Sequence, residues 1–376
     1  MKKKRILIPG LLFLVALLFP GCAKTAPQPH AHTWENRKCV TCGEEKEVHR
    51  LGNWEYVLWE ESGTMEMVSF PENAEEVPFR ELPEGISSVQ VADGITAIPD
   101  DAFWGCETLV DVTLPQTVRT IGKGAFGQCV NLTQVNIPEG VTSIGDSAFF
   151  LCGSLTQLTI PDSVTSIEGN PFQYMSAEIQ VSSKNPVISV VDGVVFNKDH
   201  TRLIACPCNK AGAYEIPNGV QEIGAHAFQN CKSLTDVTIP GSVGSLEGNP
   251  FAYAWLELKL SPENPHFSLV DGVLFDETGT KLLIYPGGKE GDTYEIPKGT
   301  TEIGEAAFTG CQHLSNVTVP ESVTTIAPNA FWNCENLRLY VWDGSYALQY
   351  AREHRPDFFY ILPDMGPEVD ESDVLD

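Results

Sequence analysis

The chain has 376 residues, 42% of them hydrophobic, and its 24 basic against 50 acidic side chains give a formal net charge of −26. A chain this acidic repels phosphate backbones, which excludes nucleic acid as a partner. The length suggests two or three globular domains, unless the chain is an array of repeats in which each unit packs only on its neighbours.

Residues 1–21 form a predicted export signal. A basic start, "MKKKR", precedes the apolar run "ILIPGLLFLVALLF", and a small residue stands before Cys22. The run is too short for a comfortable membrane span, and an uncleaved signal anchor is the alternative. The Gly21-Cys22 ending resembles a bacterial lipoprotein signal, which implies that Cys22 is lipidated and begins the mature chain; ordinary secretion is the other alternative. We therefore expect an extracytoplasmic protein that touches the membrane only through a lipid anchor.

Residues 22–31 are predicted to be a tether, and residues 32–50 a compact cysteine-histidine module. His32, Cys39, Cys42 and His49 have the spacing H-x6-C-x2-C-x6-H. Two thiolates and two imidazoles complete a tetrahedral zinc site, and one structural zinc is a way to fold a segment too short for an apolar core. The alternative is a Cys39–Cys42 disulfide or free thiols. The segment also resembles short "HTW…C..CG" modules found beside repeats in exported gut-bacterial proteins. No other cofactor is expected.

Residues 51–88 alternate apolar and polar side chains and are predicted to be N-terminal capping strands. Residues 89–343 then repeat, and one apolar strand position marks the register with separations of mostly 21 to 23 residues and two of 35 and 36. This predicts a solenoid of eleven rungs, a rung being one coil of the chain. The marked positions are Val91, Leu114, Ile137, Ile160, Val181, Ile216, Ile239, Leu260, Ile296, Val319 and Val341.

The rung at residues 132–154 shows why the repeat has this composition. Apolar and polar residues alternate over 132–137, as in a strand with one buried side, and residues 138–144 turn the chain back. Phe149 and Cys152 then fill the far end of the coil. One coil cannot bury its apolar side alone, so stacking is required. We expect an aromatic column of Phe103, Phe126, Phe149, Phe172, Phe228, Phe251, Phe308 and Phe331.

Two enlarged coils share a second pattern. Residues 185–207 match residues 264–286, and each segment follows an "EGNPF" sequence that replaces the usual "AF". Each is predicted to form two strands joined by a polar turn, so that a hairpin is built into the solenoid.

The repeated cysteines lie three residues after the phenylalanine, and Met175 and Ala254 occupy the same position in other rungs. Interchange with methionine and alanine indicates a buried free thiol that serves packing. Disulfides between adjacent rungs are the alternative. These cysteines are Cys106, Cys129, Cys152, Cys231, Cys311 and Cys334.

The outward strand positions are mostly short polar side chains, and they are the candidate ligand face. Solvation of an exposed strand is the alternative explanation for each of them. No histidine stands beside a serine or cysteine in a triad-like arrangement, so we predict no catalytic residue and no enzyme. The ligand-face candidates are Asp111, Gln134, Asn136, Gln157, Thr159, Asp236, Thr238, Asn316, Thr318 and Tyr340.

Residues 344–362 are predicted to be a C-terminal cap that contains a short helix, and residues 363–376 an acidic disordered tail. The pattern "IP..V..IG..AF..C..L..V.IP" and the "NP.....VDGV.F" insert resemble the BspA-like leucine-rich-repeat proteins of bacterial and some protist surfaces, over about residues 52–362. This resemblance implies a right-handed leucine-rich-repeat solenoid, a cell-surface location and adhesion through protein or glycan binding. We expect a monomer; a zinc-binding or metal-handling surface lipoprotein is the alternative function.

Overall fold

The structure is a computed structural model that describes residues 34–35, 37–39, 45–51, 53–70, 82–355 and 358–362. The chain divides into two units, residues 1–47 and residues 48–376. In the first unit, β1 (Trp34–Glu35) and β2 (Lys38–Cys39) form a small antiparallel pair, with Trp34 opposite Cys39. Within the described ranges, no helix is long and apolar enough to cross a membrane.

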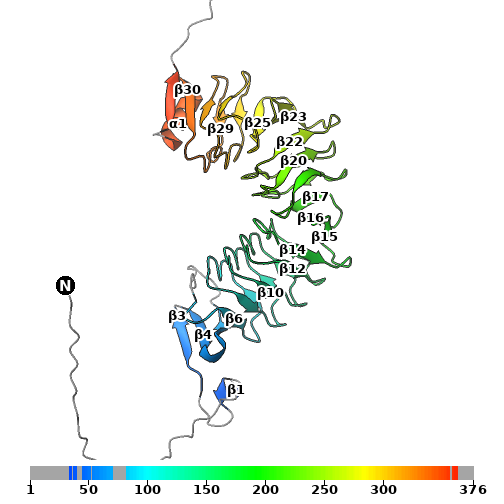
Figure 1. The fold of residues 1–376 in the computed structure, drawn as a ribbon, viewed down its shortest axis with the longest axis vertical. Helices are drawn as coiled ribbons and strands as arrows, with labels where there is room; N and C mark the ends of the chain where they lie inside the picture. Colours follow the sequence, from blue (N-terminus) through cyan, green and yellow to red (C-terminus); the bar gives the residue numbers. More distant parts are fainter. Residues whose placement is uncertain are drawn as a thin grey trace, which may run out of the picture. The chain divides into compact units, whose positions relative to one another are not determined.

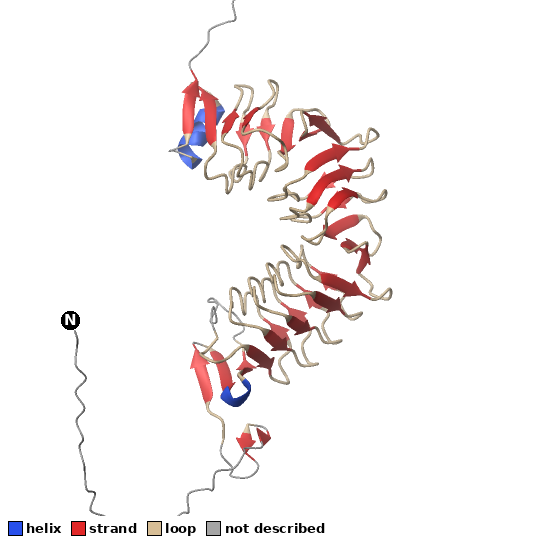
Figure 2. Ribbon diagram, in the orientation of Figure 1, coloured by secondary structure: helices blue, strands red, loops and turns tan. Residues whose placement is uncertain are grey.

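The second unit is a β-solenoid of about twelve turns, with one α-helix in its described part (Figures 1 and 2). It begins with an antiparallel meander of β3 (Val48–Leu51), β4 (Trp54–Trp59) and β5 (Thr64–Ser69), in which the short 3-10 helix η1 (Glu60–Ser62) joins β4 to β5. β5 then pairs in parallel with β6 (Ser88–Val91), placing Met67 beside Val91. The parallel stack therefore begins with β5, one rung earlier than predicted. The sequence of the predicted cap does not follow the repeat pattern, so it does not show this rung.

One parallel ladder is formed by the strands that the repeat pattern predicts, and we call it the first ladder. In-register pairs such as Val135 with Val112 and Leu158 with Ile179 carry the apolar side chains inward. After β6 its strands are β8 (Asp111–Thr113), β10 (Gln134–Asn136), β12 (Gln157–Ile160), β14 (Glu178–Val181), β18 (Gly212–Glu215), β20 (Leu234–Ile239), β22 (Glu257–Leu260), β26 (Thr293–Glu295), β28 (Asn316–Thr318), β30 (Arg338–Trp342) and β31 (Phe359–Leu362).

A second parallel ladder lies where the sequence predicts only a return of the chain. Each rung contributes only two to four residues to this second ladder, which is too short a segment to show an alternating apolar and polar pattern. These residues are strands because they pair with the neighbouring rungs. It has three groups, which we call the first, second and third blocks: β7 (Ala97–Ile98), β9 (Thr120–Ile121), β11 (Ser143–Ile144) and β13 (Ser166–Ile167); then β17 (Arg202–Ala205), β19 (Glu222–Ile223) and β21 (Ser245–Leu246); then β25 (Lys281–Ile284), β27 (Glu302–Ile303) and β29 (Thr325–Ile326).

The two long coils contain three strands each, not the predicted two. β15 (Ile188–Val191) and β16 (Val194–Asn197) are antiparallel, and β16 then pairs with β17, which enters the second ladder. β23 (Phe267–Val270), β24 (Val273–Asp276) and β25 repeat this arrangement. The extra turn is Asp192-Gly193, whose φ angles of 50° and 77° are both positive, as the favoured two-residue hairpin turns require.

The predicted aromatic column is confirmed. All eight phenylalanines are buried, and rings in neighbouring rungs stack, with centroids 5.6 Å apart for Phe103 and Phe126 and 5.7 Å for Phe126 and Phe149. In the third block Tyr285 takes the first place of the column, 5.2 Å from Phe308, which is 4.8 Å from Phe331. The stacked rings therefore form three runs: Phe103, Phe126 and Phe149; then Phe228 and Phe251; then Tyr285, Phe308 and Phe331.

The repeated cysteines are buried and free, as predicted. Five of the six thiols have a carbonyl partner in the preceding rung, as when Cys129 donates to Phe103 and Cys152 to Phe126, both at 3.1 Å; the thiol of Cys106 instead contacts the Thr108 hydroxyl at 3.9 Å. Burial raises the pKa of Cys152 to about 12, because the thiolate would lose its hydration. Packing and a weak hydrogen bond therefore account for the cysteine column.

We expect the buried thiols to resist iodoacetamide in the native protein at pH 7.5 and to react only after unfolding, because the thiolate is the reactive form. The raised folded-state pKa also makes stability depend on pH. The contribution is fully present below the unfolded pKa of about 8.5 and is lost as pH rises from there through about 12. Peptide mapping by mass spectrometry and melting between pH 7 and 11 measure both effects. Rapid native labelling of Cys152 would contradict the prediction.

Candidate binding surfaces

All ten predicted ligand-face residues lie on the first ladder. Gln134, Asn136, Gln157 and Thr159 are exposed, and the other six are partly buried. The parallel register places Gln134 beside Asp111 and Asn316 beside Arg338. Residues at the same position of paired rungs therefore lie side by side on the surface.

The face is less continuous than the repeat count predicts. β14 is not paired with β18, nor β22 with β26, because a long coil intervenes at each point, and β10 is not paired with β12 either. Residues 157–159 therefore stand in a different sheet from residues 236–238, and these in a different sheet from residues 316–318. The candidate surface consists of separate polar patches.

Three of the candidates already have partners within the chain, and one of them is Thr159, whose hydroxyl donates to Oε1 of Gln180 at 3.5 Å. Asp236 forms an ion pair with Lys259 at 2.7 Å. Hydrogen bonds from Lys259 and Thr235 lower the pKa of the Asp236 carboxyl group. Tyr340 stacks on Tyr360 of β31 with ring centroids 5.3 Å apart. The exposed candidates whose side chains make no hydrogen bond or ion pair within the described residues are Gln134, Asn136 and Gln157.

A row of aromatic side chains that was not predicted from the sequence lies beside the phenylalanine column. Trp104 stacks on Phe150, two rungs away, with ring centroids 5.5 Å apart. It reaches that far because Gly127 stands between them, where a Cβ atom would lie 2.3 Å from the indole. Tyr174 and Tyr253 continue the row, with ring centroids 6.3 Å apart. The available signal was an aromatic residue one or two positions after the column phenylalanine.

Comparison with known proteins settles what this repeat is. The sequence matches the BspA type leucine rich repeat region, in six copies, over residues 61–199, 206–261 and 289–347. The chain belongs to the BspA-type leucine-rich-repeat family. Among curated proteins no relative is found.

Solved structures of bacterial leucine-rich-repeat proteins resemble the chain. A leucine rich cell surface protein from Faecalibacterium prausnitzii is 24% identical, with a TM-score of 0.44, over 82% of this chain and 98% of that one. A leucine-rich repeat protein from Eubacterium ventriosum is 24% identical, with a TM-score of 0.48, over 77% and 82%. The pneumococcal vaccine antigen PcpA is 18% identical, with a TM-score of 0.49, over 85% and 99%.

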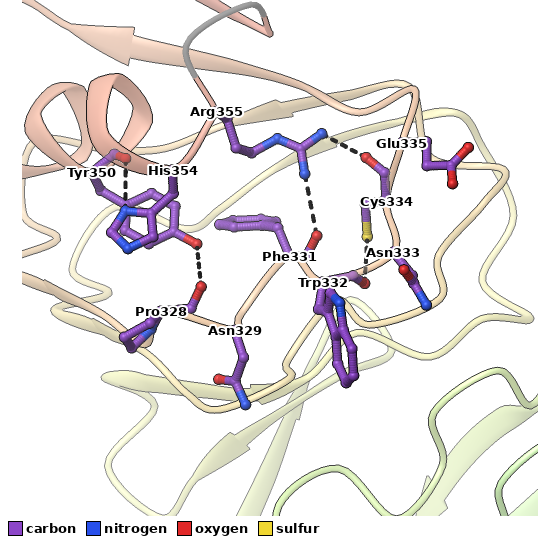
Figure 3. Close-up of a pocket in the computed structure, with 10 residues that line it drawn as sticks. All are labelled: Pro328, Asn329, Phe331, Trp332, Asn333, Cys334, Glu335, Tyr350, His354 and Arg355. Atoms are coloured by element: carbon purple, nitrogen blue, oxygen red, sulfur yellow. Dashed lines mark hydrogen bonds between the residues drawn. The ribbon is translucent and has the colours of Figure 1, made fainter. Parts of the chain in front are cut away.

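The C-terminal end of the BspA-type stack holds a pocket of about 580 Å³ beneath α1 (Tyr346–His354) (Figure 3). Its polar groups serve the fold. The Arg355 guanidinium donates to the carbonyls of Phe331, Cys334 and Leu337 at 3.2, 2.5 and 2.8 Å, and the Tyr350 hydroxyl donates to Pro328. Among the described residues, no backbone N–H of a later coil donates to these carbonyls, so the arginine takes the place of one. The pocket is therefore an end cap with an exposed rim at Trp332, which is 65% exposed.

The lipidation and metal predictions fall largely outside the described residues. Cys22, His32 and Cys42 lie there, and Cys39 is described only as a residue of β2. His49 lies in β3, where its ring stacks on Tyr56 with centroids 5.4 Å apart. The described ranges hold no group of three metal-binding side chains. The zinc site stays a prediction, and the zinc content of the purified chain with and without Cys39→Ser and Cys42→Ser measures it.

Proposed function

We propose that the chain is a non-catalytic, extracytoplasmic protein whose first-ladder face binds a protein or a glycan. The observation that supports this is the set of exposed polar side chains on β10 and β12, which lie at the same positions of two successive rungs and face solvent. Gln134, Asn136, Gln157 and Thr159 offer hydrogen-bond donors and acceptors without large desolvation costs. Many weak contacts along successive rungs add up, above all for a protein displayed in many copies.

The proposed location follows from the predicted export signal and the family. An extracytoplasmic repeat protein with a lipid on Cys22 keeps its acidic body in solution near an anionic membrane surface. Fractionation of cells tests the anchor: the wild-type chain should stay with membranes, and a Cys22→Ser chain should enter the soluble fraction. Equal distribution of the two chains would refute lipidation.

The binding proposal is tested on the Cys22→Ser chain against a panel of immobilised matrix proteins and glycans. Asn136→Arg combined with Thr159→Arg should weaken the best interaction at least about tenfold, because two long charged side chains cover the polar rows. The matched control is Thr142→Arg combined with Thr165→Arg, two exposed threonines on the opposite side of the same rungs. Equal losses in both variants, or no bound member of the panel, would contradict the proposal.

A further inference from the structure

A hollow of about 510 Å³ lies on the second ladder of the first block, away from the proposed binding face. Thr120, Ser143, Gly122, Gly145 and Glu168 are among the residues that line it. The two glycines are required by the stacking of the rungs, since a Cβ atom on Gly145 would lie 2.6 Å from the backbone nitrogen of Lys123 in the preceding rung. No side chain from these positions therefore covers the hollow.

The second block has the same architecture, and there an internal arginine occupies the corresponding place. In β17, β19 and β21 the residues in register with one another are Arg202, Glu222 and Ser245. The corresponding residues of β9, β11 and β13 are Thr120, Ser143 and Ser166. The Arg202 side chain passes over Gly224, where a Cβ atom would lie 3.2 Å from Nη2.

The guanidinium of Arg202 ends on Glu247, two rungs away. Nη1 contacts Oε1 at 2.8 Å and Nη2 contacts Oε2 at 2.6 Å, and Nη1 also contacts Oε1 of Glu222 at 2.8 Å. Such a forked pair is the strong form of carboxylate recognition. The side chain of Arg202 is only 27% exposed. These coils therefore hold an arginine side chain over the glycine and bind its head group.

The first block keeps the acceptor and lacks the arginine. Glu168 occupies the place of Glu247 in the repeated "EGNPF" sequence, whereas Thr120 and Ser143 stand where Arg202 and Glu222 stand. Glu168 is exposed, and its carboxylate makes no hydrogen bond or ion pair with the part of the chain that the structure describes. The other charged groups that line the hollow are Asp100, which accepts a hydrogen bond from the Lys123 backbone, and Lys123.

The third block differs from the first at both positions, the cation and the acceptor carboxylate. There Lys281 forms an ion pair with Glu302 at 2.6 Å, and Ala327 stands in the place of Glu168. Only the first of the three blocks thus combines the acceptor carboxylate with small residues in the place of the internal cation.

We propose that the hollow lined by Thr120, Ser143, Gly145 and Glu168, the arginine groove, binds an arginine side chain of a partner protein. The guanidinium takes the path of Arg202 and forms a forked pair with Glu168. Lysine fits less well, because its ammonium group lacks the planar fork. The net charge of −26 draws a basic partner toward the chain. The groove is on the opposite ladder from the proposed binding face, so the two proposals stand or fall separately.

The probe is a fluorescein-labelled tetra-arginine peptide, and its binding to the Cys22→Ser chain is followed by anisotropy at physiological salt, with tetra-lysine for comparison. We expect saturable binding that is several-fold tighter for arginine. Glu168→Gln should weaken it about tenfold, because a charge-assisted hydrogen bond is lost. Glu139→Gln makes the same change of net charge at an exposed residue outside the groove and should leave binding unchanged.

Two further variants use the internal comparison. Thr120→Arg with Ser143→Glu copies the second block into the first, and it should abolish peptide binding while circular dichroism stays unchanged. Arg202→Ala empties the second groove, and it should raise the stoichiometry from one peptide to two. The proposal is overturned if the wild-type chain shows no saturable arginine binding, if tetra-lysine binds equally well, or if Glu168→Gln binds as tightly as wild type.

Discussion

Replacing Phe149 with alanine is expected to lower the free energy of unfolding by about 3–5 kcal/mol, the usual range for a buried aromatic side chain. Phe149 is fully buried in the phenylalanine column, with its ring stacked on that of Phe126. Removal of the ring leaves a cavity between rungs whose backbones are fixed by two ladders, so collapse around it is restricted. Denaturant unfolding measures the loss, and hydrogen exchange in β10 and β12 shows where it is felt.

The neighbouring Phe150 is the matched control, because it is the same residue type in the same rung. Its side chain is half-buried on the outer edge and stacks on Trp104. Phe150→Ala should cost only about 0.5–1.5 kcal/mol plus a small loss of buried area. Equal effects of the two substitutions would show that the inner column has no special weight in the stability of the stack.

Loss of the C-terminal cap is the second large effect. Arg355→Ala removes three charge-assisted hydrogen bonds to carbonyls of the last repeat rung, two of which also accept a backbone N–H. We expect a loss of about 3 kcal/mol, since a single hydrogen bond to a charged group contributes about 1.5–3 kcal/mol and neighbouring bonds are not additive. A solenoid end without a cap also exposes the stack to fraying. Arg355→Lys keeps the charge without the fork and should recover part of the loss.

The control for this prediction is Arg352→Ala. Arg352 is exposed on the same helix, and no carbonyl of the last rung accepts a hydrogen bond from it in the described contacts. Its replacement should change stability by less than about 0.5 kcal/mol, as for ordinary surface positions. Thermal melting and protease sensitivity of residues 328–355 compare the variants. An Arg355→Ala chain that melts with the wild type would disprove the capping role.

Most of the repeat unit could be predicted from the residues themselves. A period of 23 residues with phenylalanine, cysteine and apolar strand positions fixed the stacking, the aromatic column and the free thiols, because identical side chains at identical positions must meet in a stack. The second ladder was not predictable, because strands such as Ser143–Ile144 carry no pattern of their own. The arginine groove was not predictable either, because it depends on Arg202 crossing two rungs.

The sequence by itself determined that this chain is a stacked repeat whose periodic apolar residues face inward, since no single coil buries enough apolar surface to fold alone. Only the tertiary structure decided which polar residues remain free for recognition. Asp236 and Glu247 are taken by Lys259 and Arg202, whereas Gln157 and Glu168 are left to solvent. Inward positions are set by chemistry that repeats along the chain, but a surface contact depends on how far one side chain reaches across its neighbours.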